Sequence, residues 1–352
     1  MTTDSTNGNF GFPAFSEDNH SLLKKYLTPE IYERLRGLTT KNGFDLTRLI
    51  HSGVQNEDSS IGVYAGDYES YTLFSELLLP IIYAYHGYSE ADNHRRDFSH
   101  IDGEVQQLDD GNQYIQSTRI RVGRNISDYP LGPGISLAQR NEVESLVSGV
   151  LATLTGDLAG RYYALYDMPD KDRKKLIAEH LLFKEGDRFL DAAGLNRDWP
   201  SGRGIFINAD RTFLVWINEE DQLRIISMET GGDVAEVYNR LSKAVAALES
   251  ELSFLYDNHL GYISSCPTNL GTAMRASVHI KLPLQAQKMD LFKEKAASLN
   301  LQIRGVHGEH SESEGGVYDV SNKRRLGISE KECVQELCNG ISELIRSEKT
   351  LE

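Results

Sequence analysis

The sequence predicts an α+β protein in two parts, a small helical part followed by a larger part that combines helices with β-strands. Two observations predict this division. Residues 19–86 contain apolar residues at helical spacing, and three short β-runs between residues 205 and 228 are joined by connections of turn length. The length of 352 residues also fits about two domains.

The helical part carries local start and stop signals. Thr28 followed by Pro29 and an acid is a cap with a first-turn proline, and Gly37 marks the end of the helix that they begin. An apolar face at helical spacing lies just before it, in residues 22–27. The apolar run TLFSELLLPIIYAY predicts a further helix that Pro80 kinks or divides.

A polar segment without periodicity follows from Gly87 to Asn112, which is typical of a linker or an extended surface segment. We therefore expect a helical N-terminal domain at residues 1–95, a linker at 96–112 and the larger domain at 113–352.

The larger part contains the predicted sheet. IFIN at 205, FLVWI at 213 and QLRIISM at 222 are separated by NADR and NEED, and such short connections favour neighbouring antiparallel strands in a meander. Asp233 and Glu236 predict a capping box at the start of the next helix. We expect further strands in ASVHIKL, LQIR and GVYDV, and a last helix from about Ser329.

Composition excludes several classes of function. Thirty-seven Lys and Arg against 52 Asp and Glu give a net charge of −15, which argues against a protein that coats nucleic acid or anionic lipid. The sequence has no run of about 18 apolar residues and no signal-peptide pattern. Cys266, Cys333 and Cys338 fit neither a disulfide framework nor a zinc site. We expect a cytoplasmic protein.

Six arginines occur in strand-like or turn-flanking segments: Arg119, Arg121, Arg124, Arg224, Arg275 and Arg304. Arg119 and Arg121 stand two apart in STRIRVGR and so project from one face of a strand. Several converging guanidinium groups would bind phosphates, whereas a solvated sheet face with salt bridges is the alternative. Neither GxxxxGK[ST] nor a GxGxxG turn occurs, so any nucleotide site must be built from side chains.

Cys266 lies in ISSCPTNLGT between a strand end and Pro267, which places its thiol at the start of a loop. Close to the arginines, this thiol would lose its proton more readily and could serve as a nucleophile or as a fixed negative charge. A small buried hydrophobe is the alternative.

Two acidic turns complete the candidate chemistry. NEED contains Glu219, Glu220 and Asp221, and HGEHSESEGG contains Glu309 among several glycines, which predicts a mobile loop able to close over a ligand. His307 and His310 in that loop lack HExxH spacing, so we predict no metal ligands there.

Several runs together resemble the phosphagen (guanidino) kinase family, most nearly its arginine kinases. They are STRIRVGRN, HLLFKEGDRFL, NEEDQLRIISM, CPTNLGT with ASVHIKLP, and GEHSESEGGVYDVSNKRRLG, while HSLLKKYLTPEIYERL and IGVYAGDYESY resemble the family's small helical domain. The resemblance implies an all-α N-terminal domain and a catalytic domain with a central antiparallel sheet flanked by helices. It also implies reversible transfer of the ATP γ-phosphoryl group to a guanidino nitrogen, with L-arginine giving phosphoarginine and ADP.

The resemblance also assigns site residues. Nucleotide binding falls on Ser117, Arg119, Ile120, Arg121, Val122, Gly123, His180, Arg224, Arg275, His279 and Arg304. Substrate binding falls on Ser59, Ser60, Ile61, Tyr64, Glu220, Cys266 and Glu309, and catalysis on Glu220, Glu309, Cys266, Arg224, Arg275 and Arg304. Glu220 and Glu309 would align the guanidinium, one of the two, with Glu220 favoured, would accept the proton, and Cys266 as a thiolate would pair with the substrate cation. No protein ligand to a metal is implied, because Mg²⁺ arrives with ATP or ADP.

One departure concerns the substrate. Arginine kinases usually have Ser-Gly-Val where this chain has Ser59, Ser60 and Ile61, which puts carboxylate recognition by backbone amides in doubt. The loop is of the short type expected for arginine, but a taurocyamine or other guanidino kinase stays open.

Three competing functions stay open as well: a hydrolase or amidinotransferase with Cys266 as nucleophile, a protein-arginine kinase, and a non-catalytic relative of the family. The expected partners are ATP and arginine, without nucleic acid or membrane, and a monomer is favoured over a dimer.

Overall fold

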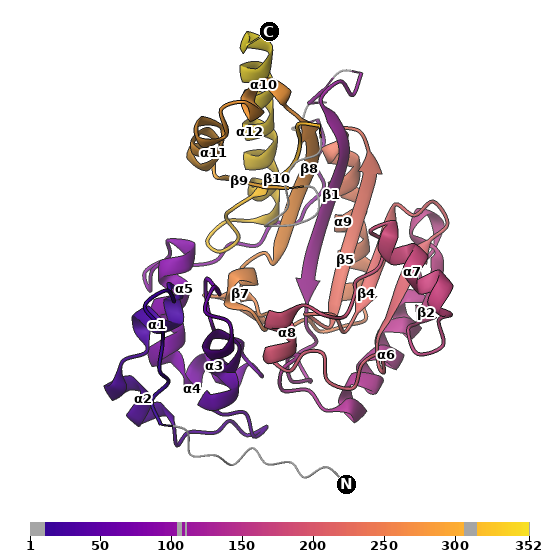
Figure 1. Cartoon of the computed structure of the whole chain (residues 1–352). Coiled ribbons are helices and arrows are strands. Elements are labelled where there is room, and N and C mark those ends of the chain that lie inside the picture. Colours follow the sequence, from indigo (N-terminus) through magenta and orange to yellow (C-terminus); the bar gives the residue numbers. More distant parts are fainter. Residues whose placement is uncertain (1–10, 104–107, 110, 306–314, 352) are drawn as a thin grey trace.

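The structure is a computed structural model that describes residues 11–103, 108–109, 111–305 and 315–351. Its helical part forms a separate cluster at the lower left of Figure 1. This part comprises α1 (Leu22–Tyr26), α2 (Pro29–Leu35), α3 (Leu46–Gln55), α4 (Glu69–Leu73) and α5 (Ser75–His86). The predicted cap is confirmed, since the Thr28 hydroxyl accepts a hydrogen bond from the Ile31 N–H, with Pro29 in the first turn.

Pro80 does not divide the apolar run, because α5 continues through it and the break falls earlier, at Phe74. A proline inside a helix costs about 3 kcal/mol. Burial of one large aliphatic side chain stabilises by roughly 1.5–3 kcal/mol, and α5 buries four of them, Leu77, Leu78, Ile81 and Ile82. Packing therefore outweighs the lost backbone hydrogen bond.

The larger part is built on one antiparallel sheet of eight strands, in the order β2-β3-β4-β5-β1-β8-β10-β9. The strands are β1 (Ile115–Arg124), β2 (Gly160–Ala164), β3 (Gly204–Asn208), β4 (Phe213–Ile217), β5 (Leu223–Thr230), β8 (Met274–Lys281), β9 (Leu301–Gly305) and β10 (Val317–Asn322). A small hairpin pairs β6 (Tyr256–Asp257) with β7 (Gly261–Tyr262). The predicted meander is confirmed as β3-β4-β5.

Helices flank the sheet. They are α6 (Leu137–Leu151), α7 (Asp170–Ala178), α8 (Arg188–Ala192), α9 (Val234–Glu249), α10 (Pro283–Ala286), α11 (Met289–Ser298) and α12 (Glu330–Leu351), with short 3₁₀ turns η1 (Gly156–Leu158) and η2 (Pro267–Asn269). Buried residues of α6, α9 and α12 form one core with Ile120 and Val122 of β1, so these helices cover one face of the sheet. The fold class expected from the sequence is confirmed.

Only half of the predicted capping box forms at the start of α9. The Asp233 carboxylate accepts from the Glu236 N–H at 3.0 Å, whereas the Glu236 carboxylate pairs with Arg240 at 3.1 Å.

The predicted linker runs as an extended segment over the larger part. Its described residues contain neither helix nor strand, yet Ile101 is buried and belongs to the main core. The Asp97 carbonyl accepts a hydrogen bond from Lys331 N–H, and the Ile101 N–H donates to the Asn239 side chain. These contacts fasten the segment to α12 and α9.

A second core joins the two parts. It combines apolar residues of α1 to α5 with residues of the larger part, among them Leu131, Leu260 and Leu326. The Tyr71 hydroxyl donates to the Ser264 carbonyl at 2.7 Å, and the Ala65 N–H donates to the Ser265 carbonyl at 2.8 Å. The helical part therefore holds the segment that leads to Cys266.

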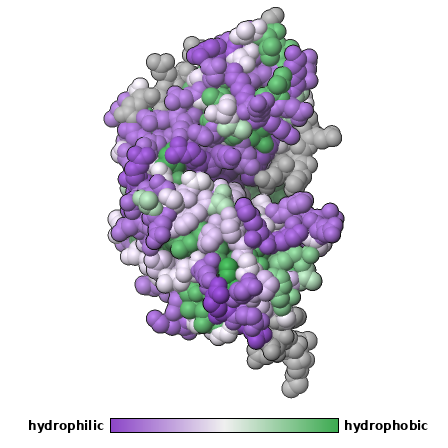
Figure 2. Space-filling view, turned by 90° about the vertical axis from the view of Figure 1, so that its left-hand side faces the viewer, coloured by the Kyte–Doolittle hydropathy of each residue, from purple (hydrophilic) through white to green (hydrophobic). Residues whose placement is uncertain are grey.

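Figure 2 shows one side of the molecule, where hydrophilic side chains predominate and hydrophobic ones are scattered in small patches. Among the helices described, none is long and apolar enough to cross a lipid bilayer.

Candidate active site

The predicted arginines converge on one face of the sheet because of strand register. Ser117, Arg119 and Arg121 alternate along β1 and so point to the same side. Arg275 of β8 lies directly opposite Arg121, and Arg224 of β5 lies opposite Gly123. Paired residues of neighbouring strands share a face, so these side chains come together above the centre of the sheet.

The same face continues across the next strands. His279 of β8 lies opposite Ser117 on one side and opposite Asp319 of β10 on the other, and Asp319 in turn lies opposite Arg304 of β9. The described face therefore carries Ser117, Arg119, Arg121, Arg224, Arg275, His279, Arg304 and Asp319. Of these, Asp319 was not singled out from the sequence.

Three residues assigned to nucleotide binding have other surroundings. Ile120 and Val122 point into the opposite, apolar core, and their strand is paired with β5 on one edge and β8 on the other, so neither side chain faces the arginines. Gly123 lies on the arginine face, where an added Cβ would come within 2.4 Å of the Asp221 carboxylate. Glycine is therefore required by close packing at this position.

Positive charge is concentrated at Arg119 and Arg121. Burial, together with nearby Arg224 and Arg275, lowers the pKa of Arg119 to about 10 and also lowers that of Arg121. Nε and Nη2 of Arg119 are buried and have no hydrogen-bond partner among the described residues. Buried donors of this kind are satisfied in a native protein, so this face fits an anionic ligand such as a phosphate chain.

Salt bridges account for only part of the face. Arg275 pairs with Asp319 at 2.8 Å and Arg224 pairs with the acidic turn, but neither contact reaches Arg119 or Arg121. A solvated sheet face laced with ion pairs therefore does not describe these two side chains.

Trp216 of β4 is a site residue that the sequence did not single out. The guanidinium carbons of Arg119 and Arg224 lie 5.4 Å and 5.8 Å from the centroid of its ring. The sequence signal that could have identified it is its position in the predicted strand FLVWI, where the meander pairs it with Arg224 of the next strand. Its ring stabilises two crowded cations by cation–π contact.

The acidic turn between β4 and β5 approaches the arginines from one side. Arg224 Nη2 lies 2.7 Å from Glu220 Oε2, and Arg224 Nη1 lies 2.8 Å from Glu219 Oε2. The other Glu220 oxygen accepts from the Asn269 amide at 3.2 Å. Burial raises the pKa of Glu220 to about 7, although Arg224 acts in the opposite direction. A carboxylate in this range is suited to general-base work.

Cys266 corrects one prediction. It lies at a loop start, as expected, but it is 5% exposed and belongs to the second core. Burial and the neighbouring Glu220 raise the pKa of its thiol to about 12, with Thr268 and Arg325 acting in the opposite direction. The expectation of a readily lost proton is therefore wrong for the free protein: a nearby arginine does act to lower the pKa of the thiol, but burial prevails.

Tyr64 links the helical part to this cysteine. Its hydroxyl lies beside Cys266, and burial together with Cys266 and Glu220 raises its pKa. In the loop that precedes Tyr64, Ser59 and Ile61 are buried, whereas Ser60 is exposed. The Ser59 hydroxyl accepts from the Gly62 N–H at 3.0 Å, and Arg188 pairs with Asp58, which ties this loop to the larger part.

His180 follows α7 and is exposed; it acts electrostatically on His279, so the two histidines are neighbours.

Glu309, His307 and His310 lie outside the described residues. Arg124 does not join the other arginines, because it points to the opposite face and is stacked on Tyr262, with its guanidinium carbon 3.3 Å from the ring centroid.

No group of three or more His, Cys, Asp or Glu side chains that could hold a metal ion occurs in the part of the chain that the structure describes.

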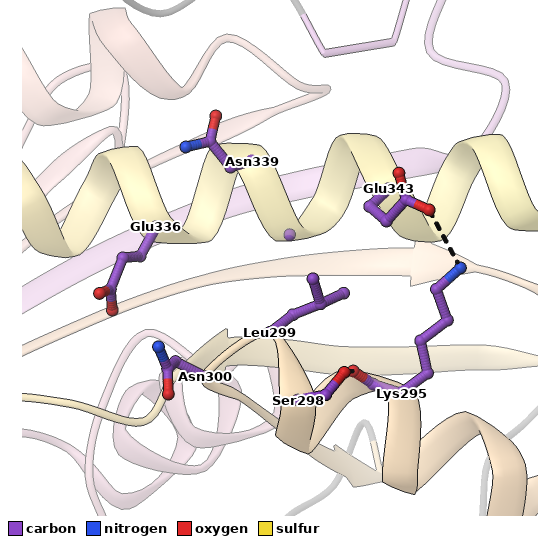
Figure 3. Close-up of a pocket in the computed structure, with 8 residues that line it drawn as sticks. Lys295, Ser298, Leu299, Asn300, Glu336, Asn339 and Glu343 are labelled. Atoms are coloured by element: carbon purple, nitrogen blue, oxygen red, sulfur yellow. Dashed lines mark hydrogen bonds and ion pairs between the residues drawn. The ribbon is translucent and has the colours of Figure 1, made fainter.

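A groove elsewhere, between α11 and α12, is shown in Figure 3, where Lys295 and Glu343 form an ion pair at 3.3 Å. Its described lining includes none of the assigned site residues.

An antiparallel sheet that places several arginines beside a half-buried carboxylate of raised pKa fits a phosphotransferase whose phosphate site is made of side chains and not of a glycine-rich loop. Comparison with known families agrees. The model of the ATP:guanido phosphotransferase C-terminal catalytic domain matches residues 142–351, and that of the N-terminal domain matches residues 17–83. The chain belongs to the ATP:guanido phosphotransferase family, and it is a kinase that acts on a guanidino nitrogen.

Individual relatives are similar over nearly the whole chain. An arginine kinase of Anthopleura japonica is 53% identical over 94% of this chain, and this chain spans only 46% of its length. An arginine kinase of Penaeus japonicus is 49% identical over 95% of this chain and 94% of its own.

Solved structures give the same picture. The substrate-free duplicated taurocyamine kinase of Schistosoma mansoni matches with a TM-score of 0.90 and 40% identity, over 95% of this chain and 48% of that one. A lombricine kinase matches with a TM-score of 0.87 and 38% identity, over 95% of this chain and 93% of its own. These matches confirm the family resemblance and the fold that it implied.

Proposed function

We propose that this enzyme transfers the γ-phosphoryl group of ATP reversibly to L-arginine, giving phosphoarginine and ADP. The observation that carries this proposal is the convergence of Arg119, Arg121, Arg224 and Arg275 beside the Glu220 carboxylate. Identities of 53% and 49% to proteins named arginine kinase support arginine as the acceptor.

The arginines bind the phosphate chain. Phosphoryl transfer proceeds through a loose transition state whose charge lies on the equatorial oxygens, so positioning and charge neutralisation supply most of the rate. Arg119, Arg121, Arg224, Arg275 and Arg304 provide this charge, and Ser117, residues 120–123 of the same strand, His180 and His279 complete the proposed nucleotide site. One well-placed arginine is worth about 10³ to 10⁵ in rate.

Glu220 orients the guanidinium and accepts its proton, because its raised pKa matches proton transfer near neutral pH. Cys266 and Tyr64, which lie near Glu220, contact the cationic substrate, and Glu309 is assigned as the second carboxylate. Ser59, Ser60 and Ile61 provide the loop for the amino-acid carboxylate. Arrival of a cationic substrate beside Cys266 favours its thiolate, so the ionised form belongs to the complex.

Mg²⁺ enters as part of the nucleotide. Most groups on the described face are guanidinium, imidazole and hydroxyl donors, which fit phosphate oxygens, and its carboxylate, Asp319, is paired with Arg275. When bound, the metal neutralises charge on the phosphates. We place the reaction in the cytoplasm, where the three free cysteines stay reduced, and we favour a monomer.

The test is a coupled assay with ATP, Mg²⁺ and L-arginine, taurocyamine, lombricine or creatine as acceptor. We expect L-arginine to be turned over with the highest kcat/KM. A taurocyamine or lombricine kinase is the second candidate, because Ser60 and Ile61 depart from the usual loop and the two kinases are structural neighbours. Turnover of taurocyamine but not of arginine would show that arginine is not the substrate. Turnover of no guanidine at all would overturn the proposed function.

A further inference from the structure

The turn that carries Glu219 and Glu220 is held by an asparagine outside the assigned site. Asn218 follows β4, is buried, and has a positive φ of 56°. Its backbone N–H donates to the Gln222 carbonyl at 2.9 Å and closes the turn. Its side-chain amide donates to the Arg140 carbonyl at 3.0 Å and to the Gly202 carbonyl at 2.7 Å.

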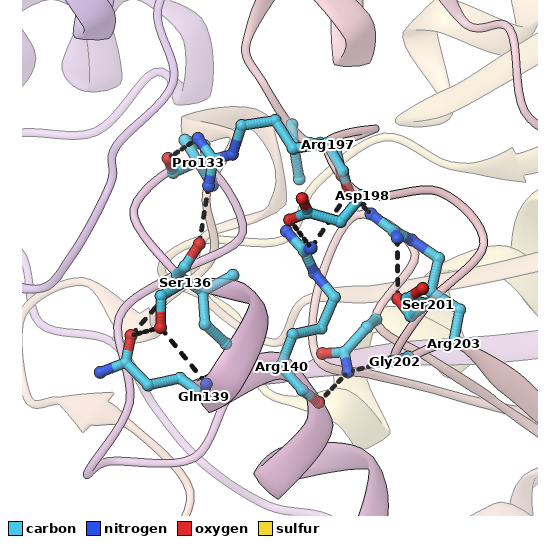
Figure 4. A network of polar contacts seen from close by, with 12 residues as sticks. Pro133, Ser136, Gln139, Arg140, Arg197, Asp198, Ser201, Gly202 and Arg203 are labelled. Atoms are coloured by element: carbon cyan, nitrogen blue, oxygen red, sulfur yellow. Dashed lines mark hydrogen bonds and ion pairs between the residues drawn. The ribbon is translucent and has the colours of Figure 1, made fainter. Parts of the chain in front are cut away.

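Both acceptors belong to a buried arginine network, shown in Figure 4. Arg140 Nη1 donates to the Asp198 carboxylate at 2.9 Å and to the Arg197 carbonyl at 3.0 Å. Arg203 donates to the Leu195 and Arg197 carbonyls, and Arg197 donates to the Pro133 and Ile135 carbonyls at 2.7 Å each. The network thus fixes α6 and the loop before β3 as one rigid support.

The far end of the turn has separate anchors. The Asp221 carboxylate accepts from Asn125 and Ser264, and the Gln222 side chain donates to the Pro130 carbonyl. Between the two ends, Gly132 packs against the turn so closely that an added Cβ would lie 3.0 Å from the Glu220 carbonyl oxygen. Asn218 is therefore the side-chain anchor on the α6 side of the acidic turn.

We propose that Asn218 is a positioning residue for the reaction: it holds the Glu219–Glu220 turn so that the Glu220 carboxylate meets Arg224 and the guanidino substrate in the productive direction. The inference rests on the proposed function in assigning Glu220 the proton. Its physical basis is that an amide gives two donors to two fixed carbonyls, and a misplacement of about 1 Å in a reacting group costs about 10²-fold in rate.

The test compares Asn218→Asp, which cannot donate to the two carbonyls, with Asn218→Gly, which keeps the positive φ and removes the amide. Asn208→Asp is the matched control, because Asn208 is buried on the strand next to β4 and its amide also donates two hydrogen bonds, to Asp157 and Thr212. All three variants lose hydrogen bonds and hence stability, which thermal unfolding measures.

We expect kcat/KM for the guanidino acceptor to fall about 10²-fold in both Asn218 variants, with ADP affinity unchanged, and the Asn208 variant to keep wild-type kinetics. The pH at which the Glu220 carboxyl titrates, followed by NMR of ¹³C-labelled glutamate, should shift only in the Asn218 variants. If the wild-type protein turned over no guanidine, the proposed function would be refuted. The titration would still test whether Asn218 positions Glu220. Unchanged kinetics and titration in Asn218→Gly, or equal effects in Asn208→Asp, would overturn the positioning role.

Discussion

Glu220 exchanges its proton near neutral pH, because burial raises its pKa to about 7. A general base works in its ionised form, so kcat for phosphoarginine formation should rise with pH through about 7 and then level off. In Glu220→Gln we expect kcat to fall by about 10²-fold. The rise of kcat with pH near 7, which is the acidic limb of the pH profile, should disappear in this variant. Steady-state kinetics between pH 5.5 and 8.5 provide the measurement.

Glu219→Gln is the matched control, since Glu219 contacts Arg224 in the same turn but is not assigned the proton. It should retain the limb near pH 7. Persistence of that limb in Glu220→Gln would show that another group accepts the proton.

Cys266 carries a thiol in the free enzyme, because burial and Glu220 raise its pKa to about 12. We therefore expect slow alkylation by iodoacetamide at pH 7. A residue that only pairs with the substrate cation is not indispensable, so Cys266→Ser should retain measurable activity. Intact-mass spectrometry during turnover should find no adduct; a covalent adduct on Cys266, with complete loss of activity in Cys266→Ser, would favour a hydrolase or amidinotransferase.

Strand β1 divides its arginines between two faces with different tasks. Arg121 lies among other cations on the face that we propose binds the nucleotide, whereas Arg124 is fully buried 3.7 Å from Glu330. Arg121→Ala should raise the Kd for ADP about tenfold or more without loss of stability, since it removes a cation crowded by Arg119, Arg224 and Arg275. Calorimetric ADP titration and urea unfolding measure the two quantities.

Arg124→Ala should behave in the opposite way. It leaves the buried Glu330 carboxylate without its cation, which costs about 3 kcal/mol of unfolding free energy. ADP binding by the folded protein should stay near the wild-type value. Normal ADP binding and strong destabilisation in Arg121→Ala would contradict the division of β1 into a site face and a core face.

The two parts of the molecule should unfold together, because the second core contains side chains from both. Trp199 and Trp216 both lie in the larger part, so their fluorescence reports on it, while far-UV circular dichroism also reports on α1 to α5. We expect the two signals to give the same midpoint in urea. In Tyr71→Phe, which loses the hydrogen bond to Ser264, both should shift together by about 1 kcal/mol.

A fragment of residues 1–95 tests the same coupling. It lacks Leu131, Leu260 and Leu326, which complete its core, so it should show little protection from amide exchange. A folded fragment, or two separate urea transitions, would show instead that the predicted boundary encloses an independent domain.

Much of the architecture was predictable because its signals are local. The cap at Thr28, the short connections of the β3-β4-β5 meander and the alternation of Arg119 with Arg121 each depend on residues close in the chain. Motif resemblance assigned the candidate site residues, since the family's motifs keep their order, and that assignment stays a prediction. Packing overrode a local signal at Pro80, where α5 continues because its apolar face is buried.

Sequence alone therefore determined the division into a helical and an α/β part, several of the helices and strands, the family, and the residue types that a phosphate and guanidinium site needs. Tertiary structure decided which of them meet. Register among β4, β5, β1 and β8 placed Trp216 opposite Arg224 and excluded Arg124 from the site, and packing against the helical part buried Cys266 and raised its pKa. The reason is physical: register and burial arise from contacts between residues far apart in the chain, so the local sequence around a residue does not predict them.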